Sequence, residues 1–173
     1  MQGSSFTAAS GSTIQAGDGT AQGSYGTLTF QPATGAGALD FQTGSTIVLG
    51  INPGGTSDLL NIAGTGSTTL LFNGNLTVTA SAFTPTDSET FNLIDWSGLS
   101  SDPTFASQFT FTGFLIGNGD EAPGLDLPDL SGTGFYWDIS NLTVNGTILL
   151  VPEPSRFMLL GLSLAMLLFR RRR

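Results

Sequence analysis

Short apolar runs separated by Gly, Asn, Pro or Asp recur along the chain from about residue 25 onward. Each run is rich in Leu, Ile, Val, Phe and Thr, which favour strands, and each is bounded by residues that favour turns. The pattern predicts strands at residues 27–30, 38–42, 45–51, 58–62, 68–72 and 75–80. No segment of this body combines a 3.6-residue apolar period with capping residues, so we expect almost no helix in it.

The pattern predicts an all-β body over residues 25–151, and two architectures fit it. A right-handed parallel β-helix, or solenoid, is favoured because Gly- and Asn-rich turns suit the tight corners between its coils. A β-sandwich is the alternative. Residues 1–24 are rich in Gly, Ser and Thr with isolated apolar residues, and we expect them to be poorly ordered or to form a truncated repeat.

Aromatic residues are concentrated in the second half of the body, between residues 83 and 137. We expect them to fill a core or to cap one end of a solenoid, with further strands at 108–114 and 134–139. A carbohydrate-stacking surface is the alternative, and its candidate residues are Phe135, Tyr136 and Trp137. Residues 141–151, NLTVNGTILLV, predict a hairpin that turns at the Asn-Gly pair.

The end of the chain has a different pattern, because residues 157–169 carry no charge and an arginine cluster follows them. We predict a hydrophobic helix over residues 156–169. The uncharged run spans only about 20 Å of a roughly 30 Å bilayer core, but flanking arginines can snorkel to the interfaces. A buried core helix is the alternative, although adjacent arginines do not enter a core. The positive-inside rule places the cluster in the cytoplasm and the body outside it. The cluster consists of Arg170, Arg171, Arg172 and Arg173.

Charge adds to this picture. The 173-residue chain has 13 acidic and 5 basic side chains, and no basic residue precedes Arg156. The charged side chains of the body are therefore all acidic, which argues against nucleic acid as a partner and favours solubility. Hydrophobic residues make up 39% of the chain and charged residues 10%, which is not a disordered composition. Cysteine is absent, so no disulfide holds the fold.

The order of Pro152, Glu153 and Pro154, a hydrophobic run and an arginine cluster resembles the PEP-CTERM sorting signal of Gram-negative bacteria, over residues 152–173. The resemblance implies recognition by an exosortase, a transpeptidase-like membrane enzyme, with cleavage near the Pro-Glu-Pro motif. It also implies an inner-membrane stage during export, then a place at the cell surface or in the extracellular matrix, with exopolysaccharide as a candidate partner.

The first residues lack the positive and apolar regions of a secretory signal peptide. We therefore expect that residue 1 is an internal start or the boundary of a fragment of a longer chain. The alternative is that the tail itself directs insertion.

Residues 44–96 resemble the repeats of β-helical passenger regions in autotransporter-type proteins. The resemblance rests on an apolar strand, a glycine turn, a Ser-Asp-x-Leu strand and a Phe-x-Leu-Ile-Asp strand. It implies a parallel β-helix with a display or adhesion role, and no catalytic residue transfers with it.

Catalysis is not expected. Before Arg156 the chain has no His, Cys, Lys or Arg, which excludes a Ser-His-Asp triad, a Schiff-base lysine and an imidazole metal site. A glycosidase needs only two carboxylates, for which Asp95 with Asp138, or Asp120 with Asp126, are candidate pairs. We predict a protein that is not an enzyme and uses no cofactor.

The acidic loop at residues 117–130 offers oxygen ligands for calcium. Its spacing matches neither the EF-hand loop nor the nonapeptide of calcium-binding β-rolls, so a solvated loop is the favoured interpretation. The candidate ligands are Asp120, Glu121, Asp126 and Asp129.

Together these features predict an exported, non-enzymatic structural or adhesion-type protein of the cell surface or exopolysaccharide matrix, sorted by its C-terminal signal. A surface-displayed carbohydrate-binding module is the alternative.

Overall fold

The computed structural model describes residues 5–17, 25–31, 37–63, 68–80, 83–109, 114–117 and 123–153. These residues are mostly β, with two short helices, η1 (Ser107–Phe109) and α1 (Leu142–Asn145). In this part of the chain no helix is long and apolar enough to cross a membrane. The predicted hydrophobic helix at 156–169 and its arginine cluster lie outside the described residues.

Three of the four sheets that the described residues form are built on rows of parallel strands, and the strands of each row follow chain order. Sheet A consists of β1 (Ser5–Ala8), β4 (Ala38–Phe41), β8 (Thr69–Phe72) and β12 (Thr104–Phe105). Sheet B consists of β2 (Thr13–Gln15), β5 (Thr46–Asn52), β9 (Asn75–Ala80) and β14 (Leu125–Asp126). Sheet C consists of β3 (Thr27–Phe30), β7 (Leu59–Ile62) and β11 (Ile94–Asp95).

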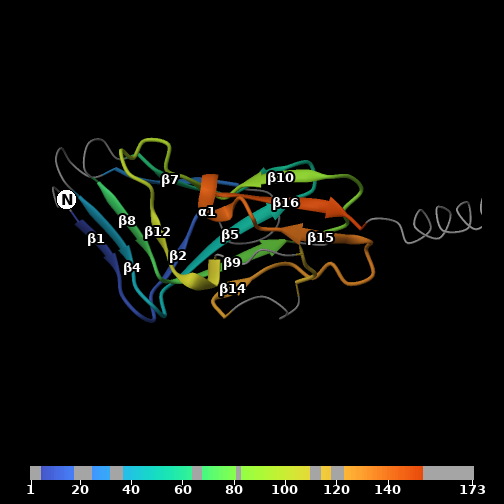
Figure 1. Ribbon diagram of the computed structural model, residues 1–173, viewed down its shortest axis with the longest axis horizontal. Helices are drawn as coiled ribbons and strands as arrows, with labels where there is room; N and C mark the ends of the chain where they lie inside the picture. The colour runs from blue at the N-terminus through green and yellow to red at the C-terminus, as the bar shows by residue number, and fades with distance from the viewer. Residues whose placement is uncertain are drawn as a thin grey trace, which may run out of the picture.

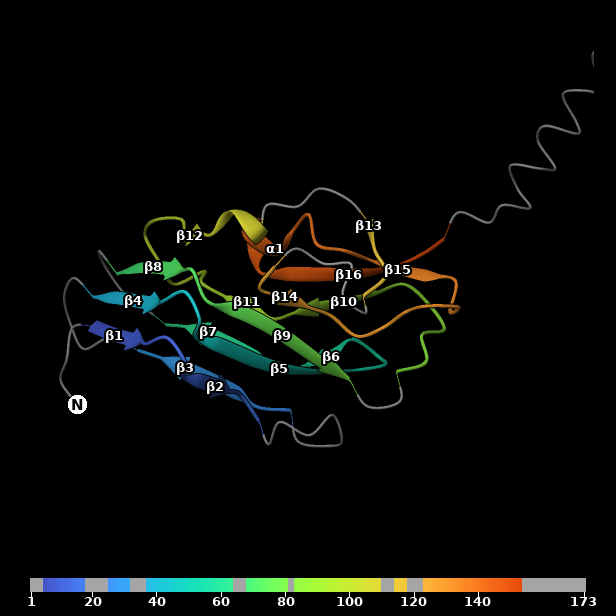
Figure 2. The same ribbon diagram turned by 90° about the horizontal axis from the view of Figure 1, so that it is seen from below.

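The chain visits these three sheets in turn. It passes from β1 to β2 to β3, returns to sheet A with β4, and repeats the circuit through β5 and β7. Figure 2 shows the resulting rows of strands, with β1, β2 and β3 along one side of the molecule. The six strands predicted between residues 27 and 80 are confirmed as β3, β4, β5, β7, β8 and β9.

Sheet D is antiparallel and is assembled from distant parts of the chain. Its order is β10 (Glu89–Asn92), β16 (Thr147–Pro152), β15 (Phe135–Asp138) and β13 (Phe114–Leu115). The last strand of the chain, β16, therefore lies in the interior of this sheet (Figure 1). A short strand, β6 (Thr56–Ser57), pairs antiparallel with the end of β5.

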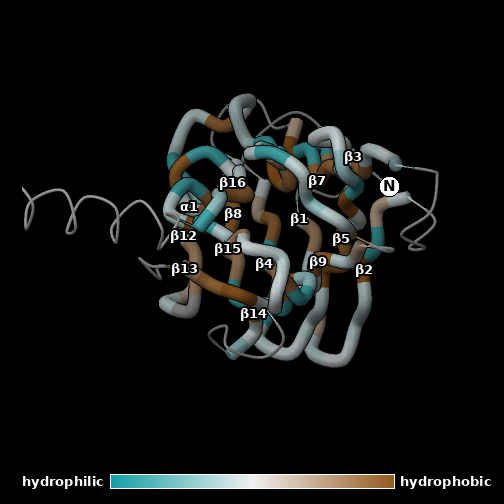
Figure 3. The backbone as a smooth tube through the Cα atoms, turned by 90° about the vertical axis from the view of Figure 1, so that its right-hand side faces the viewer, coloured by the Kyte–Doolittle hydropathy of each residue, from teal (hydrophilic) through white to brown (hydrophobic). Residues whose placement is uncertain are grey.

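The core is built from apolar side chains that the strand register aligns. Phe41 is paired with Phe72, and Phe72 with Phe105, at ring-centroid distances of 5.3 and 5.7 Å. Hydrophobic stretches coincide with strands such as β5 and β9 in Figure 3. The expectation that aromatic residues of the second half fill the core is confirmed for part of the set. The buried members are Phe91, Trp96, Phe109 and Trp137.

Two strands, β1 and β2, lie within the segment 1–24. Phe6 is paired with Leu39 of β4, and Ile14 with Ile47 of β5. Residues 5–17 therefore include two paired strands, and the truncated repeat that was the second expectation for this segment stays a prediction. Pairing with β4 and β5, which is not visible locally, accompanies strands of only three or four residues.

The predicted hairpin at residues 141–151 is wrong. Leu142–Asn145 form one helical turn, and Gly146 ends it at φ 78° with its N–H donating to the Leu142 carbonyl at 3.2 Å. A Cβ at Gly146 would overlap the Ile94 carbonyl. The Asn-Gly pair, which is also a hairpin signal, here ends a helix.

The strand predicted at residues 108–114 is only partly present. Residues 107–109 form the 3-10 turn η1, and pairing begins at Phe114 in β13. Residues 110–113 lie outside the described residues.

Candidate binding surface on sheet D

The aromatic residues of β15 lie on opposite faces of sheet D, because successive side chains of a strand alternate. Trp137 points inward and is fully buried, and its Nε1–H donates to the Pro128 carbonyl at 2.9 Å. Phe135 is half-buried against the core. The predicted platform of Phe135, Tyr136 and Trp137 is therefore not formed, since Trp137 belongs to the core.

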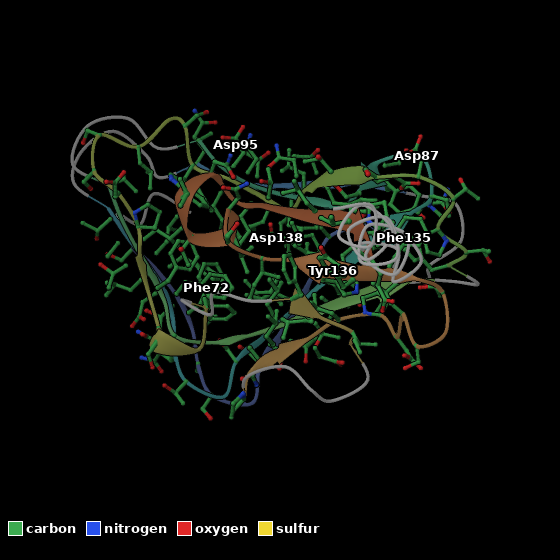
Figure 4. All side chains as sticks on the ribbon, turned by 45° about the vertical axis from the view of Figure 1, so that its right-hand side comes forward. Phe72, Asp87, Asp95, Phe135, Tyr136 and Asp138 are labelled. Carbon is green, nitrogen blue, oxygen red and sulfur yellow. The ribbon has the colours of Figure 1, made fainter. Side chains whose placement is uncertain are left out.

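Tyr136 faces outward and contacts Phe114 of the neighbouring strand β13, with ring centroids 4.0 Å apart and planes at 56°. Phe114 is 62% exposed, and Ile116, two residues further on, is 43% exposed. Val151 of β16 is the register partner of Tyr136. We call Phe114, Ile116 and Tyr136 the aromatic patch; Tyr136 is labelled in Figure 4.

Sequence reasoning placed Tyr136 among the candidates but missed Phe114. No alternation of apolar and polar residues marks it in the sequence, because Phe114, Leu115 and Ile116 are all apolar. The contact between Phe114 and Tyr136 could not be predicted either, because antiparallel pairing of β13 with β15 joins two segments that are far apart in the sequence.

The first candidate carboxylate pair, Asp95 and Asp138, is not brought together as a catalytic site. Asp95 is on sheet C and Asp138 on sheet D, and Figure 4 shows them apart. Each Oδ1 accepts a hydrogen bond from a backbone N–H two residues on, from Ser97 at 2.8 Å and from Ser140 at 2.9 Å. Both carboxylates therefore stabilise local turns.

The acidic loop is only partly described, because Asp120 and Glu121 lie outside the described residues. Asp126 is exposed and borders a shallow groove of about 240 Å³ over sheet B, together with Asn75 and Thr77. Among the described residues no group of three acidic side chains could hold a metal ion. The calcium site stays a prediction, because it depends on Asp120 and Glu121.

Asp129 sits in a turn of its own. Its Oδ1 accepts a hydrogen bond from the Ser131 N–H at 2.8 Å. Hydrogen bonds from the side chain and backbone of Ser131 hold the pKa of the Asp129 carboxyl below its usual value. This residue stabilises the turn that leads into β15.

Among the described residues, Asp58 is the buried carboxylate, with 3% of its surface exposed. Its Oδ1 accepts from the Gly26 N–H and its Oδ2 from the Gly50 N–H, each at 2.7 Å. Gly26 leads into β3 of the first circuit, and Gly50 lies in β5 of the second. Asp58 therefore joins two circuits of the chain, and its role is structural.

The predicted sorting motif, Pro152 to Pro154, begins where sheet D ends. Pro152 is the last residue of β16, opposite Phe135, and the Glu153 N–H donates to the Gly134 carbonyl at 2.8 Å. The side chains of Pro152 and Glu153 are exposed, and Pro154 lies outside the described residues. The chain thus leaves the body within the motif.

A scan against protein-family models found no match, and searches of the curated proteins and of the solved structures found none either. Function is therefore inferred from the residues of this chain. Chemically, the described surface offers an exposed aromatic patch, carboxylates engaged in turns, and a strand that ends at Pro152, the first residue of the predicted sorting motif.

Proposed function

We propose that this chain is an exported, non-enzymatic structural or adhesion-type protein of the bacterial surface, sorted by its PEP-CTERM-like tail. The observation that carries the proposal is the junction at Pro152 and Glu153. Their side chains are exposed, and the last described hydrogen bond of the body is donated by the Glu153 N–H. An exosortase that cuts after this point would leave every strand of sheet D in place.

The body is, in this proposal, a right-handed parallel β-helix whose three faces are sheets A, B and C. Support comes from the strand order, in which each of the first three circuits of the chain adds one parallel strand to each of sheets A, B and C, and the following strands β12 and β14 extend sheets A and B. A β-sandwich is disfavoured, because sandwiches are built from antiparallel sheets. Right-handedness follows from the strong preference of parallel crossover connections for that hand.

A non-enzymatic role is supported by what the carboxylates do. Asp58 accepts two backbone hydrogen bonds in the interior, and Asp95 and Asp138 each accept one within a turn. Before Arg156 the chain offers no His, Cys, Lys or Arg to act with them as base, nucleophile or cation.

The test is export of the full chain, fused to a cleavable export signal, in a Gram-negative host with and without an exosortase. We expect the exosortase host alone to yield surface-exposed protein that has lost the arginine cluster, measured by intact mass. A Pro152→Ala/Pro154→Ala variant should block processing, and Asp87→Ala, at an exposed acid elsewhere, should not. Full-length protein that stays inside the cell in both hosts would contradict the proposal.

A carbohydrate-binding module is the second candidate function, and the aromatic patch is the observation that favours it. An exposed Phe114 ring held against Tyr136 offers an apolar face on which a sugar ring can stack. On a glycan array, Phe114→Ala should abolish binding. Val144→Ala, which removes an apolar side chain that is 68% exposed on α1, should leave binding unchanged. Equal binding by the two variants would exclude this site.

A further inference from the structure

A shallow groove lies on the outer face of sheet B, where three parallel strands run side by side. Its volume is about 240 Å³, and its walls come from β5, β9, β14 and the residue before β14. Figure 2 shows β5 and β9 next to each other. The lining residues are Thr46, Asn75, Thr77, Gly124, Leu125 and Asp126. We propose that this groove binds a neutral glycan chain through the hydroxyl groups of its sugars.

Strand pairing holds the polar side chains of the groove in position. Thr46 is the register partner of Asn75, and Thr77 is the register partner of Asp126. The Asn75 N–H donates to the carbonyl of Ser45, the residue before β5, at 2.7 Å. Because adjacent strands lie about 4.8 Å apart, the sheet presents these groups at fixed spacings, and a ligand meets them already in place.

These side chains face outward and are available to a ligand. Thr46, Asn75 and Thr77 are half-buried and alternate with buried residues of the same strands, whereas Asp126 is exposed. Within the described part of the chain, none of these four side chains makes a hydrogen bond to another group of the protein. Together they offer two hydroxyls, one amide and one carboxylate, and therefore both donors and acceptors.

The chemistry of the lining favours a neutral ligand rich in hydroxyl groups. An anion would meet the carboxylate of Asp126, and no basic side chain precedes Arg156 to offset it. A bound metal needs more ligands than one carboxylate, and among the described residues no group of three His, Cys, Asp or Glu could hold one. Of the six lining residues only Leu125 has an apolar side chain, and it is 5% exposed. Sugar hydroxyls both donate and accept hydrogen bonds, so they match this set of groups.

The rows of outward side chains continue beyond the groove onto β2. Thr13 is the register partner of Thr46, and Gln15 is the partner of Val48, which lies beside Thr77. Both β2 residues are exposed. Four adjacent strands therefore present polar groups over about 14 Å, in steps of about 4.8 Å. This length suits several consecutive sugar units, so we expect the ligand to be a chain.

Export places the groove where it can meet extracellular glycan, and in that respect the inference rests on the proposed function. Binding is measured on purified protein and does not require an exosortase. A chain that is not processed can therefore still bind glycan, and a chain that binds none can still be processed, so the two failures are distinguishable.

The first test is isothermal titration calorimetry of the full chain in a sugar-free detergent. The probes are neutral hexasaccharides of glucose, galactose and mannose, and a uronic acid hexasaccharide. We expect at least one neutral hexasaccharide to bind and the uronic acid chain not to bind. The Kd should rise about tenfold or more in Asn75→Ala/Thr77→Val, because two hydrogen-bonding groups are removed.

The matched control is Asn92→Ala/Thr69→Val, which makes the same substitutions at exposed positions of sheets D and A and should bind like the wild-type chain. Circular dichroism checks that both double variants fold. Absence of binding by every neutral hexasaccharide would overturn the proposal, as would binding of the uronic acid chain with equal affinity, or equal Kd values in the two double variants. Loss of binding in Phe114→Ala with unchanged binding in the groove variant would assign the sugar to the aromatic patch and also overturn it.

A second test maps the site and uses the absence of cysteine from the chain. Thr46→Cys places a thiol in the groove, and Thr69→Cys places one on β8 of sheet A. A saturating concentration of the hexasaccharide that binds should slow maleimide labelling of the groove thiol severalfold, because a bound chain blocks access to it. Labelling of the control thiol should not change. Equal labelling rates of Thr46→Cys with and without the sugar would contradict the groove as the binding site.

Discussion

The parallel stack of sheets A to C and the antiparallel sheet D differ in how their side chains are used. In the stack, apolar residues repeat in register from strand to strand. The carboxylate of Asp58 accepts hydrogen bonds from two successive circuits of the chain. In sheet D, one face packs Trp137 into the core while the other leaves Phe114 exposed beside Tyr136. The comparison indicates that the stack supplies stability, whereas sheet D offers an exposed surface and carries the chain to the proposed sorting motif.

The largest difference in stability between the two regions is expected at Phe72, in the core of the parallel sheets. Phe72 is fully buried and contacts the rings of Phe41, Phe105 and Phe109 at 5.2 to 5.7 Å. Phe72→Ala should lower the free energy of unfolding by about 3–5 kcal/mol, measured by urea denaturation. Phe114→Ala removes an equally large side chain from sheet D and should cost less than about 0.5 kcal/mol. Similar losses in the two variants would mean that the regions do not differ.

The next largest effect is expected at the carboxylate that joins two circuits. Asp58→Ala leaves the N–H groups of Gly26 and Gly50 without their acceptor in the interior, and should cost about 3 kcal/mol. Asp87→Ala, at an exposed acid, is the matched control. Urea denaturation measures the free energy of unfolding of both variants. If Asp58→Ala lowers it no more than Asp87→Ala does, the hydrogen bonds of Asp58 do not stabilise the fold.

A smaller loss of stability is expected at Trp137, on the inner face of sheet D. Trp137→Phe keeps most of the apolar contact with Phe83 and Phe91 but removes the donor to the Pro128 carbonyl. We expect a loss of about 2 kcal/mol in thermal or urea unfolding, most of it from the acceptor left behind. Unchanged stability would indicate that this hydrogen bond does not hold the segment before β15.

The smallest effect concerns pH at the turn before β15. The pKa of Asp129 is lower in the folded chain than its usual value, so the carboxylate contributes stability above that usual value. The contribution is lost as pH falls through the folded-state pKa. Asp129→Asn should therefore lower the urea midpoint slightly at neutral pH, and the difference from the wild-type chain should shrink as pH falls through the folded-state pKa. A difference that stays the same at every acidic pH would rule out this linkage.

The sequence predicted the stack better than it predicted sheet D, and the reason is physical. Each strand between residues 27 and 80 carries its own apolar run and its own flanking turn residues, so it is visible locally. β13 has only two residues, and its pairing with β15 is non-local. The Asn145-Gly146 pair was ambiguous, because a glycine with positive φ serves both a hairpin and a helix end.

The candidate site was likewise predictable from the sequence only in part. Sequence reasoning found Tyr136 but grouped it with Trp137, because the number of aromatic residues in a strand does not by itself say which face is covered. Which face lies inward is decided by the packing of Trp137 against Phe83 and Phe91.

The most direct test of the central claim is the intact mass and the unfolding free energy of the protein released at the surface of an exosortase-bearing host. We expect a C-terminus at or just after the Pro152–Pro154 motif, and an unfolding free energy equal to that of the full chain in detergent, because sheet D ends at that motif. A C-terminus upstream of Thr147, which removes β16, would contradict the account, as would surface protein that retains its arginine cluster.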